Sequence, residues 1–241
     1  MTRVTSVVVP TLNEDFSGAA QRLNECLSAL DGAFEVIFVD DSSDEHRARA
    51  GEQIAATDPR IDVRIVEGPH AGKGAAIRRG VTEARGSVIF TMDADLPVPL
   101  EHVGQFLRLL DEGADVVIAE RPLDRAFDSA LRYAVSRGLL VIQRAFVFHS
   151  GQFKDTQCGF KAFRGDLARD IARGQLVDGG MYDLEYLFDA RRQGARIVTV
   201  PVVPNAEVRE SRVDVWGCIR RDWIDVVRIR LKPRQARRRT D

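Results

Sequence analysis

Apolar residues along the chain follow two patterns that alternate. Short runs rich in β-branched residues predict buried strands, and between them apolar residues recur every three or four positions, as on one face of a helix. The strands that such runs predict in the first half are Val4–Val9, Phe34–Val39, Val88–Met92 and Ala114–Ala119, while Ile61–Val66 is predicted from its alternating residues. This alternation is typical of a doubly wound α/β fold, with a mostly parallel sheet and helices on both faces.

Turn residues and prolines bound the helices that separate these strands. A helix is expected over Asp15–Gly32, and a polar helix follows the second strand to about Thr57. Gly68–Gly74 is predicted to be a loop that opens the next helix, and a further helix should run over Pro99–Leu110. Each pair of successive strands is therefore joined by a helical crossover, as parallel strands require.

The pattern changes after Arg121. We expect a long helix, a short strand, two helices, a last strand and a C-terminal amphipathic helix. These elements are Arg125–Phe148, Phe160–Phe163, Asp166–Arg173, Met181–Arg192, Arg196–Val203 and Val213–Arg230. We assign residues 1–212 to one α/β domain and residues 213–241 to a basic amphipathic helix and tail.

Composition narrows the class of protein. The 241 residues are 44% hydrophobic and 29% charged, which is typical of a globular domain with one large core. A formal net charge of -1 argues against attraction of the whole protein to nucleic acid, and no apolar run approaches the roughly 18 residues of a membrane-spanning helix. Three widely spaced cysteines and an N-terminus without a signal-like apolar region favour a reduced, cytoplasmic setting.

Two carboxylates follow the strand that begins at Val88. Asp93 and Asp95 are one residue apart, so both can point the same way and converge on one divalent cation with oxygen ligands. Such an ion would neutralise a diphosphate. The alternative for an Asp-x-Asp pair is a solvated acidic loop after a strand.

Polar motifs follow two more strands of the predicted sheet. Pro10–Glu14 comes after the first strand, Asp40–Ser43 after the second, and Asp93–Asp95 after the fourth. Because the carboxyl ends of parallel strands meet at one edge, these motifs should line a single crevice. A carboxylate there can accept a hydrogen bond from a nucleobase while the metal takes the phosphates. The predicted ligand is a nucleoside diphosphate.

In order and spacing, these motifs and two others resemble those of the family 2 glycosyltransferases with the GT-A (Rossmann-like) fold. The match is strongest to the polyprenyl-phosphate branch, the dolichyl-phosphate glucose and mannose synthases, and within it to the glucosyltransferases. The motifs that carry the resemblance are Val7–Glu14, Val39–Asp44, Gly72–Arg78, Met92–Asp95 and Asp155–Lys161. Together they cover about residues 4 to 212.

The resemblance implies which residues hold the nucleotide sugar. Those expected to bind its nucleobase and ribose are Pro10, Leu12, Glu14 and Asp41, and those expected to bind metal and diphosphate are Asp93, Ala94 and Asp95. Two positions depart from the family pattern. Pro97 stands where mannose synthases often have a Gln, so a third protein ligand of the ion is missing there. Leu12 stands where an aromatic residue is common, so base stacking is not implied.

The reaction implied is displacement at the anomeric carbon of a nucleotide sugar by a lipid monophosphate, with inversion. Mg²⁺ or Mn²⁺ on Asp93 and Asp95 would stabilise the leaving diphosphate, and basic side chains would bring the second anion close. The residues on which transfer should depend are Asp95, Arg121, Arg132 and Arg212. Those expected to contact the acceptor or the sugar are Arg132, Arg137, Asp155, Gln157, Lys161, Ser211 and Arg212.

Each of these assignments has a structural alternative. The arginines are candidates for ordinary surface residues on a helix. Lys73, between two glycines that permit close backbone approach, is expected to contact phosphate or sugar, or else to mark a plain turn before a helix. Asp155, Gln157 and Lys161 are also compatible with a structural turn beside Gly159.

The acceptor side is expected to involve a membrane surface. An apolar segment over Leu139–Phe148 and the basic residues between Arg228 and Arg239 are both suited to docking on an anionic leaflet. The alternative is that the apolar segment packs in the core and that the basic residues face solvent. We therefore expect a peripheral enzyme on the cytosolic membrane face. Its donor should be UDP-glucose or, next, GDP-mannose, and its acceptor a polyprenyl phosphate.

Three other functions would place different demands on this sequence. A family 2 transferase with a saccharide or protein acceptor would need a carboxylate base, either Asp155 or Asp183. A sugar nucleotidyltransferase would carry a Gly-rich phosphate loop after the first strand, whereas Pro10–Glu14 contains no glycine. Outside the enzymes, the remaining possibility is a catalytically silent membrane adaptor that keeps the fold and uses its basic tail.

Overall fold

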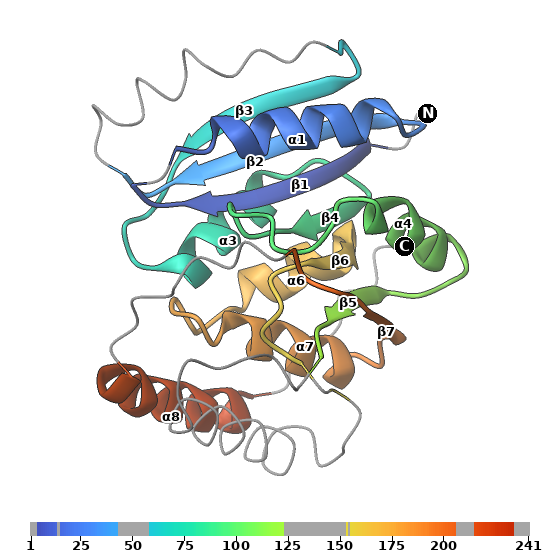
Figure 1. Cartoon of the computed structure of the whole chain (residues 1–241). Coiled ribbons are helices and arrows are strands. Elements are labelled where there is room, and N and C mark those ends of the chain that lie inside the picture. The colour runs from blue at the N-terminus through green and yellow to red at the C-terminus, as the bar shows by residue number, and fades with distance from the viewer. Residues whose placement is uncertain are drawn as a thin grey trace.

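The computed structural model describes residues 4–13, 15–42, 58–122, 153, 155–205 and 215–233. These residues form a seven-stranded sheet in the order β3-β2-β1-β4-β6-β5-β7 (Figure 1). The strands are β1 (Val4–Thr11), β2 (Ala33–Asp40), β3 (Ile61–Glu67), β4 (Val88–Thr91), β5 (Val116–Glu120), β6 (Lys161–Arg164) and β7 (Ile197–Pro201). All seven predicted strands are present, most with bounds shifted by one or two residues.

Strand β6 is antiparallel to both of its neighbours, β4 and β5. The pairs β1–β2, β1–β4, β2–β3 and β5–β7 are parallel, so the prediction of a mostly parallel sheet is confirmed. The direction of β6 was not predicted. It matters for function, because an antiparallel strand begins at the edge where its parallel neighbours end, and Asp155–Phe160 therefore enters the sheet at that edge.

Helices cover both faces of the sheet, as predicted. They are α1 (Ser17–Ser28), α3 (Lys73–Glu83), α4 (His102–Asp111), α6 (Gly165–Arg173), α7 (Tyr182–Arg192) and α8 (Val215–Leu231). Val7 and Val9 pack with residues of α1 and α4, while Val8 packs with residues of α3, α6 and α7. The alternation of side chains along β1 thus divides the interior into two apolar cores, one on each face.

Local contacts set the helix starts that differ from the expected ones. α1 begins at Ser17 because the Asp15 carboxylate accepts a hydrogen bond from the Ser17 N–H at 2.9 Å and so precedes the helix. α4 begins at His102, three residues after Pro99, since a turn joins the His102 N–H to the Pro99 carbonyl at 3.3 Å. The predicted helices ending near Thr57 and over Arg125–Phe148 lie outside the described residues.

The C-terminal helix α8 packs beside α7 (Figure 1). Val226 and Ile229 of α8 are buried in the core that α3, α6 and α7 share. Trp223, Val227 and Leu231 are exposed instead. The predicted domain boundary at residue 212 lies outside the described residues and stays a prediction. Among the helices described, none is both long and apolar enough to cross a membrane.

Candidate active site

The first two strands of the site end side by side, with Thr11 opposite Asp40. Asp40 is fully buried, and its Oδ1 accepts hydrogen bonds from the Thr11 hydroxyl at 3.2 Å and the Ser42 N–H at 3.0 Å. The Ser42 hydroxyl oxygen in turn accepts one from the Asn13 N–H at 2.7 Å. Asp40 therefore fixes both loops that carry the predicted nucleotide contacts. Sequence reasoning missed this role, although a carboxylate at the last position of a buried strand is an unusual signal.

Asp41 is the predicted nucleotide contact on the second loop. Its Oδ1 accepts a hydrogen bond from the His70 N–H at 2.9 Å, which joins this loop to the loop after β3. A Cβ on Gly68 would lie 1.9 Å from the same oxygen, so only glycine leaves room for the Asp41 carboxylate. Leu12 on the first loop is 56% exposed. Glu14 lies outside the described residues.

Asp93 follows β4, and its carboxylate forms an ion pair with the ammonium of Lys73. A Cβ on Gly159 would lie 2.5 Å from the Asp93 carboxylate, so this glycine forms a wall against which the carboxylate rests. Burial opposes ionisation of Asp93, but Lys73, Lys161 and Arg121 together hold its pKa below the usual value. Asp93 is thus an ionised carboxylate in a site rich in cations.

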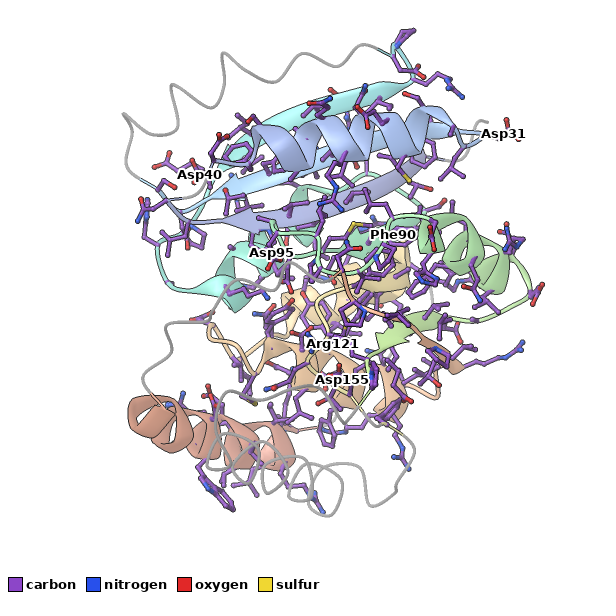
Figure 2. All side chains as sticks on the ribbon, viewed as in Figure 1. Asp31, Asp40, Phe90, Asp95, Arg121 and Asp155 are labelled. Carbon is purple, nitrogen blue, oxygen red and sulfur yellow. The ribbon has the colours of Figure 1, made fainter. Side chains whose placement is uncertain are left out.

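The negative charge of Asp95 also acts on the ammonium of Lys73. Burial alone would lower the pKa of Lys73, but the negative charges of Asp93, Asp183 and Asp95 raise it. The charges of Asp93 and Asp95 therefore both act on the Lys73 ammonium. Figure 2 shows Asp95 near the middle of the carboxyl edge of the sheet, between Asp40 and Arg121.

The donor set fits a divalent cation in part. Asp93 and Asp95 offer the oxygen ligands that Mg²⁺ and Mn²⁺ accept. No third His, Cys, Asp or Glu joins them in the described parts of the chain, and the carbonyl of Pro97 already accepts a hydrogen bond from the Asn205 N–H at 2.8 Å. Water and diphosphate oxygens would have to complete the coordination sphere. Metal binding by this pair stays a prediction.

The backbone around Lys73 is closely packed. Lys73 is the first residue of α3, and Gly72 before it has a φ of 114°, which favours glycine. A Cβ on Gly74 would lie 2.7 Å from the carbonyl oxygens of Val177 and Gly179. The Ala75 N–H also donates to the Asp178 carbonyl at 3.1 Å. The two glycines therefore let α3 meet the 175–180 loop, and this contact aims the lysine at Asp93.

Arg121 and Asp155 form a second ion pair in the site (Figure 2). The Arg121 Nε donates to Asp155 Oδ2 at 2.6 Å, and Asp155 Oδ1 accepts a further bond from the Gln157 N–H at 3.0 Å. Burial would lower the pKa of Arg121, but Asp155 raises it, so the guanidinium stays charged. Asp155 is predicted to contact sugar or acceptor, and here it orients an arginine. The Gln157 side chain is exposed.

Lys161 and Asp183 form a third pair, which is enclosed. Lys161 is 1% exposed, and its ammonium contacts Asp183 Oδ1 at 2.5 Å and the Cys158 carbonyl. Burial raises the pKa of Asp183, although Lys161 and Lys73 oppose the shift. The positive charge of Lys161 acts on Asp93 and helps to lower the pKa of that carboxyl group. Its direct contact with sugar or phosphate stays a prediction.

The structure thus brings seven charged side chains into one electrostatic cluster. They are the carboxylates of Asp93, Asp95, Asp155 and Asp183 and the cations of Lys73, Arg121 and Lys161. With all of them ionised, four negative and three positive charges leave a formal balance of -1. The remaining predicted site residues lie outside the described residues: Arg132, Arg137, Ser211 and Arg212.

Comparison with solved structures shows the fold. Glucosyl-3-phosphoglycerate synthase from Mycobacterium tuberculosis, crystallised with Mn²⁺, uridine diphosphate and phosphoglyceric acid, superposes with a TM-score of 0.70 at 23% identity. The match covers 95% of this chain and 78% of the synthase. This likeness confirms the GT-A fold inferred from the sequence.

The family is shown by a family model, and comparison with curated proteins agrees with it. A dolichyl-phosphate beta-glucosyltransferase of Trichomonas vaginalis is 29% identical over 245 residues, which cover 94% of this chain and 71% of the relative. Glycosyltransferase AglD of Haloferax volcanii is 30% identical over 98% of this chain and 39% of its own length. The model of Glycosyl transferase family 2 matches residues 6–168, which include the strand ends of the site. The chain therefore belongs to glycosyl transferase family 2.

Proposed function

We propose that this enzyme transfers a hexose from a nucleotide sugar to a polyprenyl phosphate, with inversion at the anomeric carbon and with help from Mg²⁺ or Mn²⁺. Glucose is the favoured sugar and mannose the next. The names of the curated relatives support the lipid phosphate acceptor, since several are dolichyl-phosphate glucosyltransferases and one is the dolichol-phosphate mannosyltransferase of Pyrococcus furiosus.

The observation that carries the proposal is the state of the carboxylates in the site. A sugar or protein hydroxyl needs a general base, and the candidates for that role are Asp155 and Asp183. Asp155 is bound to Arg121 at 2.6 Å, and Asp183 to Lys161 at 2.5 Å. A phosphate monoester, with a second pKa of about 6, is already largely dianionic at neutral pH and needs no base. The site therefore suits a phosphate nucleophile better than a hydroxyl.

The leaving diphosphate would be handled at Asp93 and Asp95. A divalent ion held there would neutralise the charge that develops as the sugar leaves. Such an ion would change the formal balance of the seven-residue cluster from -1 to +1. Lys73 is positioned to contact the same diphosphate.

Arg121 is the described cation best placed to attract the acceptor phosphate. It is largely buried, with 16% of its side chain exposed, and Asp155 holds it from one side. A fixed guanidinium loses little freedom when it binds a phosphate, and an electrostatic contact of this kind typically lowers a barrier by about 3 to 4 kcal/mol. Arg132, Arg137 and the pair Ser211 and Arg212 are proposed to complete the acceptor site.

The decisive assay offers labelled UDP-glucose and GDP-mannose separately to the purified protein with polyprenyl phosphate. A lipid-linked sugar should form with one donor, and it should not form with the corresponding polyprenol or with a water-soluble saccharide. Asp95→Ala should abolish transfer with the fold intact by circular dichroism. No lipid-linked product with either donor would reject the proposal, and transfer to a hydroxyl acceptor would favour the alternative enzyme.

We further propose that the enzyme acts at the cytosolic membrane face and that its C-terminal region contacts the lipid. In support, α8 exposes Trp223, Ile224, Val227 and Leu231 together with Arg228 and Arg230. The sequence after Pro233 adds four arginines. Each basic residue near an anionic leaflet contributes about 1 kcal/mol to binding.

Vesicle flotation tests the membrane contact. The protein should float with vesicles that contain anionic lipid and stay behind with neutral ones, and binding should weaken as salt is raised. Trp223→Ser together with Leu231→Ser should reduce flotation without loss of fold. Flotation combined with no metal-dependent nucleotide binding by calorimetry would instead favour the adaptor.

A further inference from the structure

The ammonium of Lys73 lies on the carboxylate that is expected to hold the metal ion. Its Nζ contacts Asp93 Oδ1 directly. The same ammonium lies 6.0 Å from the centre of the Tyr182 ring, so an aromatic residue bounds it on another side. Lys73 keeps 39% of its side chain exposed and Asp93 keeps 24%. The pair is therefore partly open to solvent and to a ligand, in contrast to the enclosed pair of Lys161 and Asp183.

Both partners are held in place by backbone packing. Gly74 and Ala75 fasten the start of α3 to the 175–180 loop, and the Gln175 side-chain N–H adds a bond to the Gly74 carbonyl at 2.8 Å. On the other side, Gly159 forms the wall behind Asp93. The ion pair thus joins two fixed segments and differs from a surface pair that forms by chance between mobile side chains.

An ammonium and a divalent cation compete for one carboxylate. Mg²⁺ requires near-octahedral oxygen ligands at about 2.0 to 2.1 Å, and Mn²⁺ sites are likewise built from oxygen ligands. Two cations that shared Asp93 at such distances would repel each other strongly. The flexible stem of Lys73 allows its ammonium to move away if another anion receives it.

We propose that Lys73 is a built-in counter-cation that occupies Asp93 until the nucleotide diphosphate arrives, then transfers its contact to the diphosphate and leaves Asp93 to the metal. This inference rests on the proposed function, because it requires that Asp93 and Asp95 bind the ion. Its consequence is that metal and nucleotide bind cooperatively, each raising the affinity for the other by the same factor.

Cooperative binding would keep the net charge of the site nearly balanced in a transferase. A divalent ion bound without nucleotide would leave the cluster with excess positive charge, and Lys73 prevents this by holding Asp93. Once the diphosphate enters, it supplies the negative charge that both Lys73 and the ion need. The site thus takes up donor and metal together.

The test measures Mn²⁺ binding by electron paramagnetic resonance, with and without UDP, for the wild type and Lys73→Met. Without UDP, Lys73→Met should bind Mn²⁺ about tenfold more tightly, because its carboxylate is free of the ammonium. The factor by which UDP raises Mn²⁺ affinity should fall about tenfold in the same variant. Couplings between sites are typically 5- to 150-fold, so both changes are measurable. Lys73→Arg, which keeps a cation in place, should resemble the wild type.

A matched control separates competition between Lys73 and the metal at Asp93 from a general loss of positive charge. Arg79→Met also removes one positive charge from α3, but Arg79 pairs with Glu83 and is half exposed. It should leave Mn²⁺ affinity unchanged. Equal affinity of wild type and Lys73→Met without UDP, or equal tightening in Arg79→Met, would overturn the inference. Absence of Mn²⁺ binding to the wild type even with UDP would instead remove the metal site of the proposed function.

Discussion

The two ends of the sheet hold buried carboxylates in different ways. At the amino end, Glu35 of β2 is 1% exposed and accepts hydrogen bonds from the Ser6 hydroxyl at 2.5 Å, the Arg85 N–H at 2.5 Å and the guanidinium groups of Arg64 and Arg85 at 3.0 Å. At the carboxyl end, Asp93 has one direct ion-pair partner within the described part of the chain, Lys73.

The difference separates a structural carboxylate from one that can serve a ligand. Every donor that holds Glu35 would have to be given up before it could bind anything else, and each lost bond costs free energy. Asp93 has to release one flexible ammonium, and 24% of its side chain is exposed to a ligand. In Figure 2, Asp31 and Asp40 mark the two ends of the sheet at β2, and Asp95 lies nearer to Asp40.

The largest effect should come from Asp93→Asn. Removing the charge leaves the diphosphate without its metal contact, so transfer should fall about 1000-fold, equivalent to about 4 kcal/mol of barrier. Stability should change little, because the site is partly open to solvent. Steady-state kinetics and urea unfolding measure the two quantities. Asp62→Asn, an exposed carboxylate at the amino end, is the matched control. Activity of Asp93→Asn within tenfold of the wild type would contradict its role.

Glu35→Gln should lower stability and leave transfer nearly unchanged, the opposite of Asp93→Asn. Breaking a fully buried ion pair typically costs about 3 to 5 kcal/mol, and here we expect about 2 to 3 kcal/mol because Arg85 is largely exposed. The turnover of the folded protein should stay close to that of the wild type. A urea midpoint that does not shift would show that the four donors contribute little to stability.

Gly159→Ala should reduce metal binding less than the loss of the Asp93 charge reduces transfer. The new Cβ would lie 2.5 Å from the Asp93 carboxylate, which must rotate away from its wall. Overpacking of this kind typically costs about 1 to 3 kcal/mol. We expect Mn²⁺ affinity in the presence of UDP to fall about tenfold, with Gly180→Ala, where a Cβ meets open space, as the control. Unchanged metal affinity would mean that the wall does not set the position of Asp93.

The smallest effect should appear in the pH dependence of stability. Burial opposes ionisation of Glu35, but its bonds to Ser6, Arg85 and Arg64 hold its pKa below the ordinary value of a glutamate. A lowered pKa contributes stability that is present above the unfolded value and is lost as pH falls through the folded value. The stability gap between wild type and Glu35→Gln should therefore narrow below pH 4.5. A gap that stays constant down to pH 3 would count against a charged Glu35.

Much of the fold could be predicted because the signals are local. Most predicted strands are apolar runs, Ile61–Val66 alternates apolar and polar residues, and a proline or a carboxylate lies within a few residues of each strand end. The placement of Asp41, Asp93 and Asp95 at one edge followed from the parallel order of strands. Outside the described residues, the assignments of Glu14 and Arg132 stay predictions.

The partners of the charged residues could not be predicted in the same way. Lys73 and Asp93 are 20 positions apart, Arg121 and Asp155 are 34 apart, and Glu35 reaches Arg85 across 50. No short pattern links residues at such separations. The antiparallel direction of β6 has the same origin, since it depends on which strands the segment joins.

By itself the sequence determined the strands, the order of the polar motifs that follow them, and the family. Apolar periodicity and strand-end motifs depend only on residues that are close together along the chain. The tertiary structure alone decided which cation faces which carboxylate. Those pairings arise only when distant segments pack, and they leave Glu35 and Asp183 enclosed while Asp93 stays within reach of a ligand.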